Sequence, residues 1–229
     1  MRFIDLGTVT PEYSVCADRV ILGSHSQGND TLLIYSRDRP CISVGRFQKI
    51  GETVNLEYTE KNDIPVVRRV SGGSSIYSDG NQMTYSLIIS KDRLPATREG
   101  SFAAVCGAVV AALRALGITA EHKPVNDILV SGRKISGGAQ ARSGSAILQH
   151  GSIILDIDEN VVASSLVNNK KRSYDGLTSI KECLGYIPSR KVIADALISG
   201  FSETFERPDE GELSEKEISD IERSVLLLV

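Results

Sequence analysis

Lys134 lies in the segment KISGGAQ, where Gly137, Gly138 and Ala139 have almost no side chain. Small residues within a strand often mark the close approach of a ligand or of another backbone. A lysine beside such a bare surface could neutralise a carboxylate or phosphate oxygen. An exposed strand lysine next to a β-bulge would produce the same pattern, so this segment alone leaves both interpretations open.

A second segment, RRVSGGSS at residues 68–75, ends a strand with two arginines and opens into a loop of glycines and serines. Backbone N–H groups and guanidinium groups in such a loop can bind a phosphate. A surface turn between solvated arginines would explain the same residues. The loop is not a P-loop, because GxxxxGK[ST] is absent, and no helix follows the glycines as a dinucleotide fingerprint requires. Two small, basic loops on strands of one chain favour an anion site.

Three other features are weaker candidates for chemistry. His150, followed by Gly151, stands in a predicted strand, where a single histidine is more often structural. The basic run at residues 170–172 indicates a solvated loop, or else a contact with a phosphate or an acidic partner. The four cysteines lack a CxxC pair, which argues against a zinc site or a disulfide scaffold and favours buried thiols. They are Cys16, Cys41, Cys106 and Cys183.

The elements that must position these residues follow from hydrophobic patterning. Apolar runs predict strands at residues 2–6, 31–35, 41–47, 64–70, 76–77 and 83–90. Residues 126–155 predict three more strands, joined by Gly/Ser turns at 131–132 and 143–145. Helices are predicted at residues 11–22, 55–61, 101–116 and 159–167, and from residues 189 and 214 onward.

These elements predict an α/β (α+β) fold with a mixed, largely antiparallel sheet flanked by helices. We expect one domain over residues 1–229, with a C-terminal acidic helix at 210–229. In the first helix, Asp18 and Arg19 are expected to face solvent. The apolar face of the helix from residue 189 is predicted to contain Val192, Ile193, Ala196, Leu197 and Phe201.

The composition is that of an ordinary soluble domain, with 41% hydrophobic and 24% charged residues. A net charge of -3 gives no indication of a nucleic-acid or anionic-membrane partner. The sequence shows no signal peptide and no window long enough for a membrane span, so we expect a cytoplasmic protein.

Three segments in this order resemble the catalytic domain of the lipoate-protein ligase A family. They are PVVRRVSGGSSIYSDGNQMTYSLI, NDILVSGRKISGGAQARSGSAILQHGSIILDID and LTSIKECL, and VGRFQ and VNLEY fit as well. The resemblance covers roughly residues 1–205. It is specific to the superfamily that also contains biotin protein ligases and the octanoyl and lipoyl transferases, all with a mixed sheet flanked by helices.

The resemblance implies an enzyme that converts lipoate and MgATP to lipoyl-AMP and transfers the lipoyl group to a lysine of an acceptor domain. Acceptors of this kind are the 2-oxoacid dehydrogenase E2 subunits and the glycine-cleavage H protein. Lys134 would be the catalytic residue, and Asp127 would face Mg²⁺. The residues implied to bind ATP and the adenylate are Arg69, Ser71, Gly72, Gly73, Ser74, Ser75, Ile76, Tyr77, Asn126, Asp127, Lys134, Gly137, Ala139, Gln140, His150 and Gly151.

The sequence also departs from the family pattern. Ser74 replaces the third glycine of RRxSGGG, and Ser78 replaces the histidine after the aromatic residue. The C-terminal accessory domain of the long ligases has no counterpart, as in the short archaeal-type ligases, so we expect a separate accessory subunit.

Three alternatives remain. An octanoyl or lipoyl transferase would need a cysteine just before Asn126 or before Leu177, and neither place holds one. A biotin protein ligase is disfavoured because the arginine loop of those enzymes is of the GRGR type, whereas this chain has RRVSGG. A non-catalytic lipoyl-binding subunit is disfavoured by the presence of Lys134.

Overall fold

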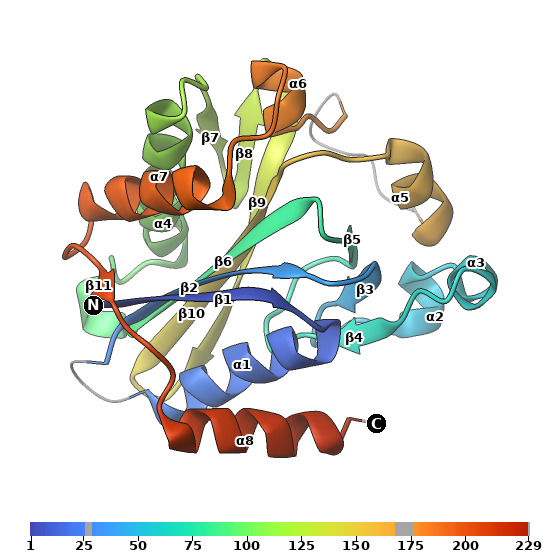
Figure 1. Cartoon of the computed structure of the whole chain (residues 1–229), viewed down its shortest axis with the longest axis horizontal. Coiled ribbons are helices and arrows are strands. Elements are labelled where there is room, and N and C mark those ends of the chain that lie inside the picture. The colour runs from blue at the N-terminus through green and yellow to red at the C-terminus, as the bar shows by residue number, and fades with distance from the viewer. Residues whose placement is uncertain (26–28, 168–175, 229) are drawn as a thin grey trace.

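The computed structural model describes residues 1–25, 29–167 and 176–228, and most of its strands form one large sheet. These strands are β1 (Arg2–Val9), β2 (Thr31–Arg37), β6 (Gln82–Ser90), β7 (Glu121–Lys123), β8 (Asp127–Val130), β9 (Arg133–Ser143), β10 (Ala146–Ile154) and β11 (Asp209–Glu210). Their order is β11-β1-β2-β6-β10-β9-β8-β7 (Figure 1). Only the β1–β2 and β1–β11 pairs in this sheet are parallel among the described residues, which confirms a mixed, largely antiparallel sheet.

A second sheet of three strands stands beside the large one (Figure 1). Its strands are β3 (Cys41–Val44), β4 (Val66–Arg68) and β5 (Ile76–Ser78), in the order β4-β3-β5. Strand β3 ends at Val44, three residues before the predicted end at Phe47, and a loop follows. The glycine- and serine-rich loop at residues 71–75 connects β4 to β5 and therefore belongs to this small sheet.

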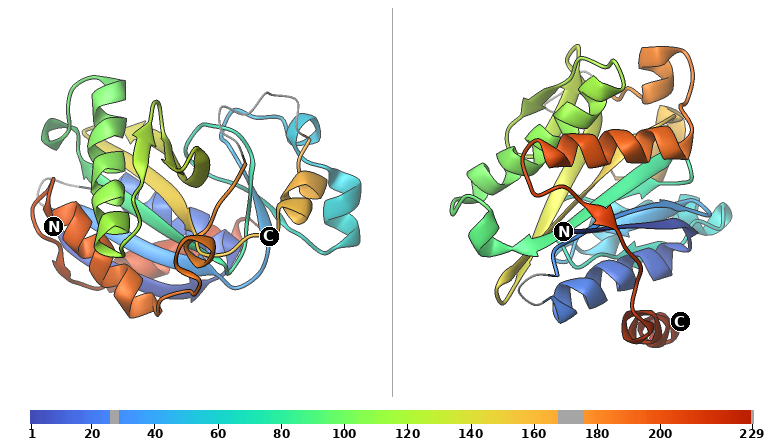
Figure 2. Two further views of the ribbon diagram at one scale, coloured as in Figure 1. Left: turned by 90° about the horizontal axis from the view of Figure 1, so that it is seen from above. Right: turned by 60° about the vertical axis from the view of Figure 1, so that its left-hand side comes forward.

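Helices cover both faces of the large sheet (Figure 2). Helices α4 (Arg98–Ala115) and α7 (Arg190–Ser202) pack on one face, while α1 (Pro11–Ser24) and then α8 (Glu215–Leu226) lie on the other. Strand β2 is buried along its whole length. Its Leu32 and Ile34 side chains pack in the core under α4 and α7, and its Leu33 side chain packs in the core under α1. The remaining helices are α2 (Ile50–Thr53), α3 (Leu56–Lys61), α5 (Glu159–Ser165), α6 (Ile180–Leu184) and a 3-10 turn, η1 (Lys91–Arg93).

Most helix starts agree with their capping residues. Thr10 caps α1 just before Pro11, Ser189 caps α7, and Ser214 with Glu217 forms the expected capping box of α8. Sequence patterning missed the short elements α2, α6, β7 and β11, which have too few residues to show a period. The basic run at residues 170–172 lies outside the described residues.

Two side chains contradict the expected helix faces. Asp18 is only 1% exposed, because it lies on the same stripe of α1 as Ser14, Val15 and Ile21 and points at the sheet. Val192 is 47% exposed, because the buried stripe of α7 begins at Ile193. The Asp18 prediction was wrong because the buried stripe of α1 includes Ser14, Val15 and Leu22 and therefore extends over the position of Asp18.

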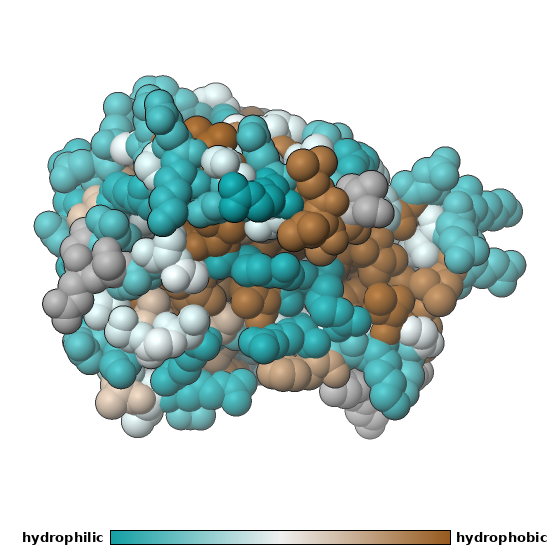
Figure 3. Space-filling model, turned by 90° about the horizontal axis from the view of Figure 1, so that it is seen from below, coloured by the Kyte–Doolittle hydropathy of each residue, from teal (hydrophilic) through white to brown (hydrophobic). Residues whose placement is uncertain are grey.

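The side of the molecule on which α8 lies has both polar and apolar surface. Figure 3 shows this side, and apolar surface gathers near the C-terminal end of α8, where Leu226, Leu227 and Leu228 are exposed. No helix among the described residues is long and apolar enough to cross a membrane.

The close packing of α4 against α7 generates a stability prediction. A Cβ on Gly200 would lie 2.3 Å from the Ala108 carbonyl oxygen and 2.4 Å from the Ala112 nitrogen, whereas a Cβ on Gly107 would meet nothing within 4 Å. Gly200→Ala should therefore lower the free energy of unfolding by about 1–3 kcal/mol through overpacking. Gly107→Ala, the matched helical control, should raise it by about 0.5–1 kcal/mol. Urea unfolding measures both, and equal effects would show that the helices do not pack this closely.

Candidate functional site

A β-bulge determines where the Lys134 side chain points. The register between β8 and β9 shifts, so that Leu129 pairs with Lys134 while the neighbouring Ile128 pairs with Ser136. The extra residue, Ile135, reverses the alternation of side chains along β9. Lys134 therefore lies on the same face of the strand as Gly137 and Ala139, although regular alternation would place it on the opposite face. The bulge and the lysine site, considered as alternatives in the sequence, are parts of one feature.

The absence of a side chain at Gly137 makes room for the lysine. A Cβ on Gly137 would lie 2.5 Å from both Cε and Nζ of Lys134. The ammonium group lies 2.6 Å from Oδ1 of Asp127, and the lysine side chain remains 21% exposed. The backbone of Lys134 also forms hydrogen bonds with Gly176 and Thr178. These bonds fix the start of β9 along the edge that does not face β8. The result is a fixed cation over a bare stretch of strand.

Arg69 organises the loop at residues 71–75 from within. Its guanidinium donates to the carbonyl oxygens of Ser43 (2.7 Å), Gly72 (2.6 Å) and Ser74 (2.8 Å), and its Nε donates to Ser71 Oγ (3.1 Å). Burial lowers the pKa of Arg69 to about 10, and this value leaves the side chain charged at neutral pH. Arg69 thus fixes the loop backbone.

The loop meets the large sheet at two places, one on β10 and one on β9. Ser71 Oγ lies 2.6 Å from Nε2 of His150, which projects from β10. A Cβ on Gly73 would lie 3.8 Å from Cβ of Ala139. Because His150 pairs with Ala139 across the β9–β10 ladder, it shares the face that contains Lys134. The structure therefore brings together the two segments that the sequence singled out.

Other implied site residues lie elsewhere or are engaged by the protein. Gln140 lies on the opposite face of β9, where its amide bonds to Gln149 and to Ser101 of α4. Gly151 also lies on that face, and a Cβ there would be 2.4 Å from the Tyr85 hydroxyl oxygen. Asn126 bonds to the backbone of Gly138. These residues support the sheet rather than the open face beside Lys134.

The residues at the end of the loop contact the segment that follows β3 and their own strand β5. Ser75 bonds to Gln48 (2.8 Å) and Thr53 (2.9 Å), and the Tyr77 hydroxyl donates to Asp79. Ile76 is 39% exposed. Sequence reasoning missed Gln48 and Thr53 as partners of this loop, since nothing in their local pattern indicates a contact across more than twenty residues.

Sequence reasoning also missed two residues behind His150. Its Nδ1 lies 2.6 Å from Oδ2 of Asp18, which also accepts a bond from the Tyr35 hydroxyl at 3.3 Å. Asp18, His150 and Ser71 are all buried. The apolar stripe of α1, on which Asp18 stands among buried residues, was the signal that could have revealed it.

Asp127 is the one carboxylate among the implied site residues. No group of three or more His, Cys, Asp or Glu side chains that could hold a metal occurs among the described residues. A single carboxylate next to an ammonium does not form a protein-only metal cage. It fits a Mg²⁺ ion that keeps waters and is carried by substrate phosphates, which is the usual arrangement for this ion.

Three of the four thiols are poorly placed to act as nucleophiles. Cys16, Cys41 and Cys106 are fully buried, and burial raises the pKa of each thiol, that of Cys106 to about 12. A thiol must ionise to attack, so these three are disfavoured. Cys183 of α6 is partly buried, and its Sγ lies 3.9 Å from the Thr178 hydroxyl.

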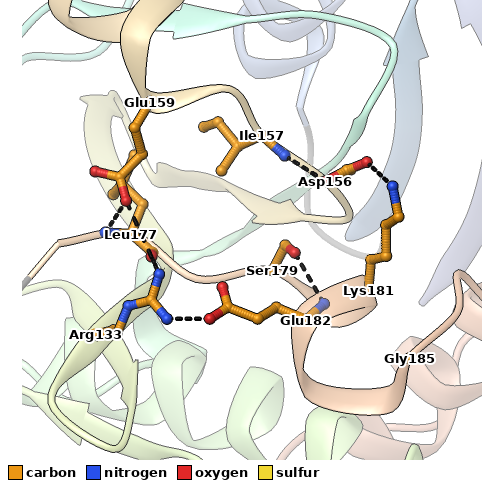
Figure 4. A pocket seen from close by; sticks show the side chains of 9 residues that line it. All are labelled: Arg133, Asp156, Ile157, Glu159, Leu177, Ser179, Lys181, Glu182 and Gly185. Atoms are coloured by element: carbon orange, nitrogen blue, oxygen red, sulfur yellow. Dashed lines mark hydrogen bonds and ion pairs between the residues drawn. The ribbon is translucent and has the colours of Figure 1, made fainter.

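An open pocket of about 390 Å³ lies next to this end of β9 (Figure 4). Its charged side chains point toward one another, with Arg133 paired to Glu182 and Lys181 paired to Asp156 at 2.6 Å. Leu177, which bridges to the Lys134 backbone, forms part of the lining. The lining holds three carboxylates and two cations, so the pocket offers no net positive charge to an anion.

Comparison with known proteins places this geometry in context. Residues 10–202 match the protein-family model described as the lipoyl protein ligase A/B catalytic domain. Octanoyltransferase LipM of Halalkalibacterium halodurans is 33% identical over 186 residues, covering 69% of this chain and 67% of that protein.

Two solved structures are similar over nearly the whole chain. A bi-partite lipoate protein ligase of Thermoplasma acidophilum, studied with its E2 lipoyl domain, gives a TM-score of 0.86 at 27% identity, covering 98% of this chain and 91% of that one. Lipoate-protein ligase A bound with ATP also gives a TM-score of 0.86, at 29% identity, covering 98% and 93%. The chain therefore belongs to the lipoyl protein ligase A/B catalytic domain family, whose enzymes include both octanoyltransferases and lipoate ligases.

Proposed function

We propose that this enzyme is an ATP-dependent lipoate-protein ligase. It would join lipoate, or a similar acyl acid such as octanoate, to the lysine of an acceptor domain through an acyl-adenylate. The observation that carries the proposal is the fixed Lys134 ammonium on the bare face of β9, opposite the loop that Arg69 holds. The similarity to an ATP-bound lipoate-protein ligase A supports the use of ATP.

The chemistry requires charge neutralisation. In the first step, a carboxylate oxygen of the acid attacks the α-phosphorus of ATP, an O–P bond forms, and the bond to pyrophosphate breaks. Both reactants are anions, so a fixed ammonium group at Lys134 and backbone N–H groups of the loop would stabilise the charge that develops. Mg²⁺ bound with ATP would neutralise the remaining phosphate charge, and Asp127 is the carboxylate available to it.

In the second step, the acceptor lysine amine attacks the carbonyl carbon of the acyl-adenylate. The C–N bond forms, the C–O bond to AMP breaks, and the amine loses a proton. Lys134 would continue to hold the phosphate and carbonyl oxygens while AMP leaves. Holding both reactants in line on a rigid sheet would supply much of the rate enhancement.

The second candidate function is an octanoyltransferase that forms a thioester on a cysteine, favoured by the similarity to LipM. Such an enzyme needs an ionisable thiol at the acyl site. Three of the cysteines are buried, and the partly buried Cys183 stands on α6 with its Sγ 3.9 Å from the Thr178 hydroxyl. This arrangement favours the ligase. Purified protein, incubated with lipoate or octanoate, MgATP and an acceptor domain, distinguishes the two by the mass of the acceptor.

The first prediction from the proposed function concerns Lys134. Lys134→Ala should reduce ATP-dependent acceptor modification by at least about 10³-fold, because it removes a charge on which the first step depends. Gly137→Ala should reduce it by about 10²-fold, since its Cβ displaces the ammonium while the lysine remains present. Gly107→Ala, whose Cβ would meet nothing within 4 Å and whose backbone is helical, is the control. Near wild-type rates for Lys134→Ala would eliminate the assigned role.

The second prediction concerns the cysteines. Replacing Cys183 by Ser should leave ATP-dependent modification within about twofold of wild type, because no thioester forms on the proposed path. Octanoyl-thioester substrate should give no stable acyl-protein by intact mass. An acyl adduct that disappears in Cys183→Ser would identify the enzyme as a transferase.

The third prediction concerns a partner. The similar Thermoplasma acidophilum ligase is described as bi-partite. We therefore expect that this chain also needs a separate accessory subunit for adenylation, and that the purified chain alone forms little acyl-AMP. Complete adenylate formation by the chain alone, measured by chromatography of labelled nucleotide, would refute this requirement and leave the ligase assignment intact.

A further inference from the structure

A chain of buried hydrogen bonds runs from α1 to the glycine-rich loop. Asp18 Oδ2 lies 2.6 Å from His150 Nδ1, and His150 Nε2 lies 2.6 Å from Ser71 Oγ. The Arg69 Nε–H donates to the same Ser71 oxygen at 3.1 Å. The chain joins residues far apart in sequence, from a helix, a central strand and a loop, and none of these contacts is exposed to solvent.

The donors and acceptors in this chain can be assigned from its ends. Arg69 is always a donor, so Ser71 Oγ accepts from it and keeps its own hydrogen to donate to His150 Nε2. His150 Nε2 must then be unprotonated, and its Nδ1–H donates to the carboxylate of Asp18. The Tyr35 hydroxyl donates to the same carboxylate oxygen. The result is a neutral histidine in a single tautomer, fixed by the carboxylate behind it.

The alternative, a protonated His150, conflicts with the surroundings. Ser71 Oγ would then accept from both Arg69 and His150, and its own hydrogen would lose its acceptor. Hydrogen bonding therefore favours a His150 that donates from Nδ1 to Asp18 and accepts at Nε2 from Ser71.

The buried Asp18 carboxylate is not explained by a contribution to the stability of the fold. Its Oδ1 is buried and has no hydrogen-bond partner among the described residues. An incompletely bonded buried carboxylate generally costs stability, and a neutral residue of the same shape often matches or improves it. A reason other than stability is therefore needed for its presence behind His150.

The position of Ser71 supplies that reason. Ser71 begins the loop whose Gly72 and Ser74 carbonyls are bonded to Arg69, and its own carbonyl accepts from the Arg46 N–H at 2.8 Å. We propose that Asp18 and His150 are positioning residues for the reaction. Asp18 fixes the tautomer of His150, His150 orients Ser71, and Ser71 sets the loop backbone that receives the adenylate phosphate. This inference rests on the proposed ligase function.

The same three side chains have the order of a Ser–His–Asp nucleophile. Here, however, the serine is fully buried and its oxygen already accepts from a cation, which makes it a poor nucleophile. The test must therefore include a search for an acyl-serine. Octanoyl-thioester should leave the intact mass of the protein unchanged, and an adduct lost in Ser71→Ala would overturn the positioning role.

The decisive variant is Asp18→Asn, which keeps the shape and removes the anionic acceptor. We expect the kcat/KM for ATP to fall about 10²-fold, as for other small misplacements of reacting groups. The KM for the acceptor domain should not change, and the unfolding temperature should stay within about 4 °C of wild type. Wild-type kcat/KM for ATP would overturn the inference.

Asp30→Asn is the matched control. Asp30 is also a buried carboxylate bonded to a histidine, since its Oδ1 lies 2.8 Å from His25 Nε2, but it lies at the opposite end of β2 from Tyr35. It also pairs with Arg93 at 2.7 Å. Asp30→Asn should lower the unfolding temperature and keep kcat/KM. Equal losses of activity and stability in both variants would reduce Asp18 to a structural role.

A spectroscopic readout separates this inference from the proposed function. The chain contains three histidines, so ¹⁵N-labelled imidazole signals can be assigned by substitution. We expect His150 to be protonated at Nδ1 in the wild type and to change its tautomer in Asp18→Asn. Protonation at Nε2 in the wild type would contradict the chain of bonds. If the wild type, assayed with its accessory subunit, shows no ATP-dependent activity, the ligase proposal fails, and the tautomer measurement still tests the contact.

Discussion

The hydrogen bond between Ser71 and His150 joins the two sheets of this enzyme at the place where chemistry is proposed. It connects the loop of the small sheet to β10 at the centre of the large one, at 2.6 Å. A neutral buried hydrogen bond contributes only about 0.5–1.5 kcal/mol to stability. The apolar residues on both faces of the large sheet contribute far more, since each buried Leu or Ile side chain stabilises by about 1.5–3 kcal/mol. The bond therefore determines geometry rather than stability.

The second constraint is the direction of Lys134. Strand alternation would place its ammonium on the face covered by α4, where a buried cation would lack solvent. The bulge at Ile135 reverses that alternation, and Gly137 leaves the space that the side chain occupies. Asp127 then accepts from the ammonium at 2.6 Å. Bulge, glycine and carboxylate together produce a cation that is held in place and still accessible.

The sequence predicted the fold class, most strands and the longer helices, because hydrophobic period and capping residues are local signals. It also singled out both segments that meet at the site. It did not predict which face of the sheet each residue occupies, because the bulge reverses the alternation of side chains along β9. No residue near Lys134 indicates that a bulge is present. Gln140 and Gly151 were grouped with Lys134 because the family resemblance implied it, although the sheet places them on its other face.

Contacts between elements that are distant in the chain could not be predicted from the sequence either. Asp18 was assigned to solvent because charged side chains usually lie there, and its partner His150 stands more than a hundred residues away. The carbonyl contacts of Arg69 likewise depend on how β3, β4 and the loop fold together. Residues whose role arises from a third element require the structure, and here they stand directly behind the proposed site.

The most direct test of the ligase account is isotope exchange between pyrophosphate and ATP. The protein, with its accessory subunit if one is required, is mixed with MgATP, labelled pyrophosphate and lipoate or octanoate, without any acceptor domain. Reversible formation of an acyl-adenylate predicts that label enters ATP only when the acid is present. If no label enters ATP under these conditions, while the same preparation transfers an octanoyl group from a thioester to an acceptor, the central claim is contradicted.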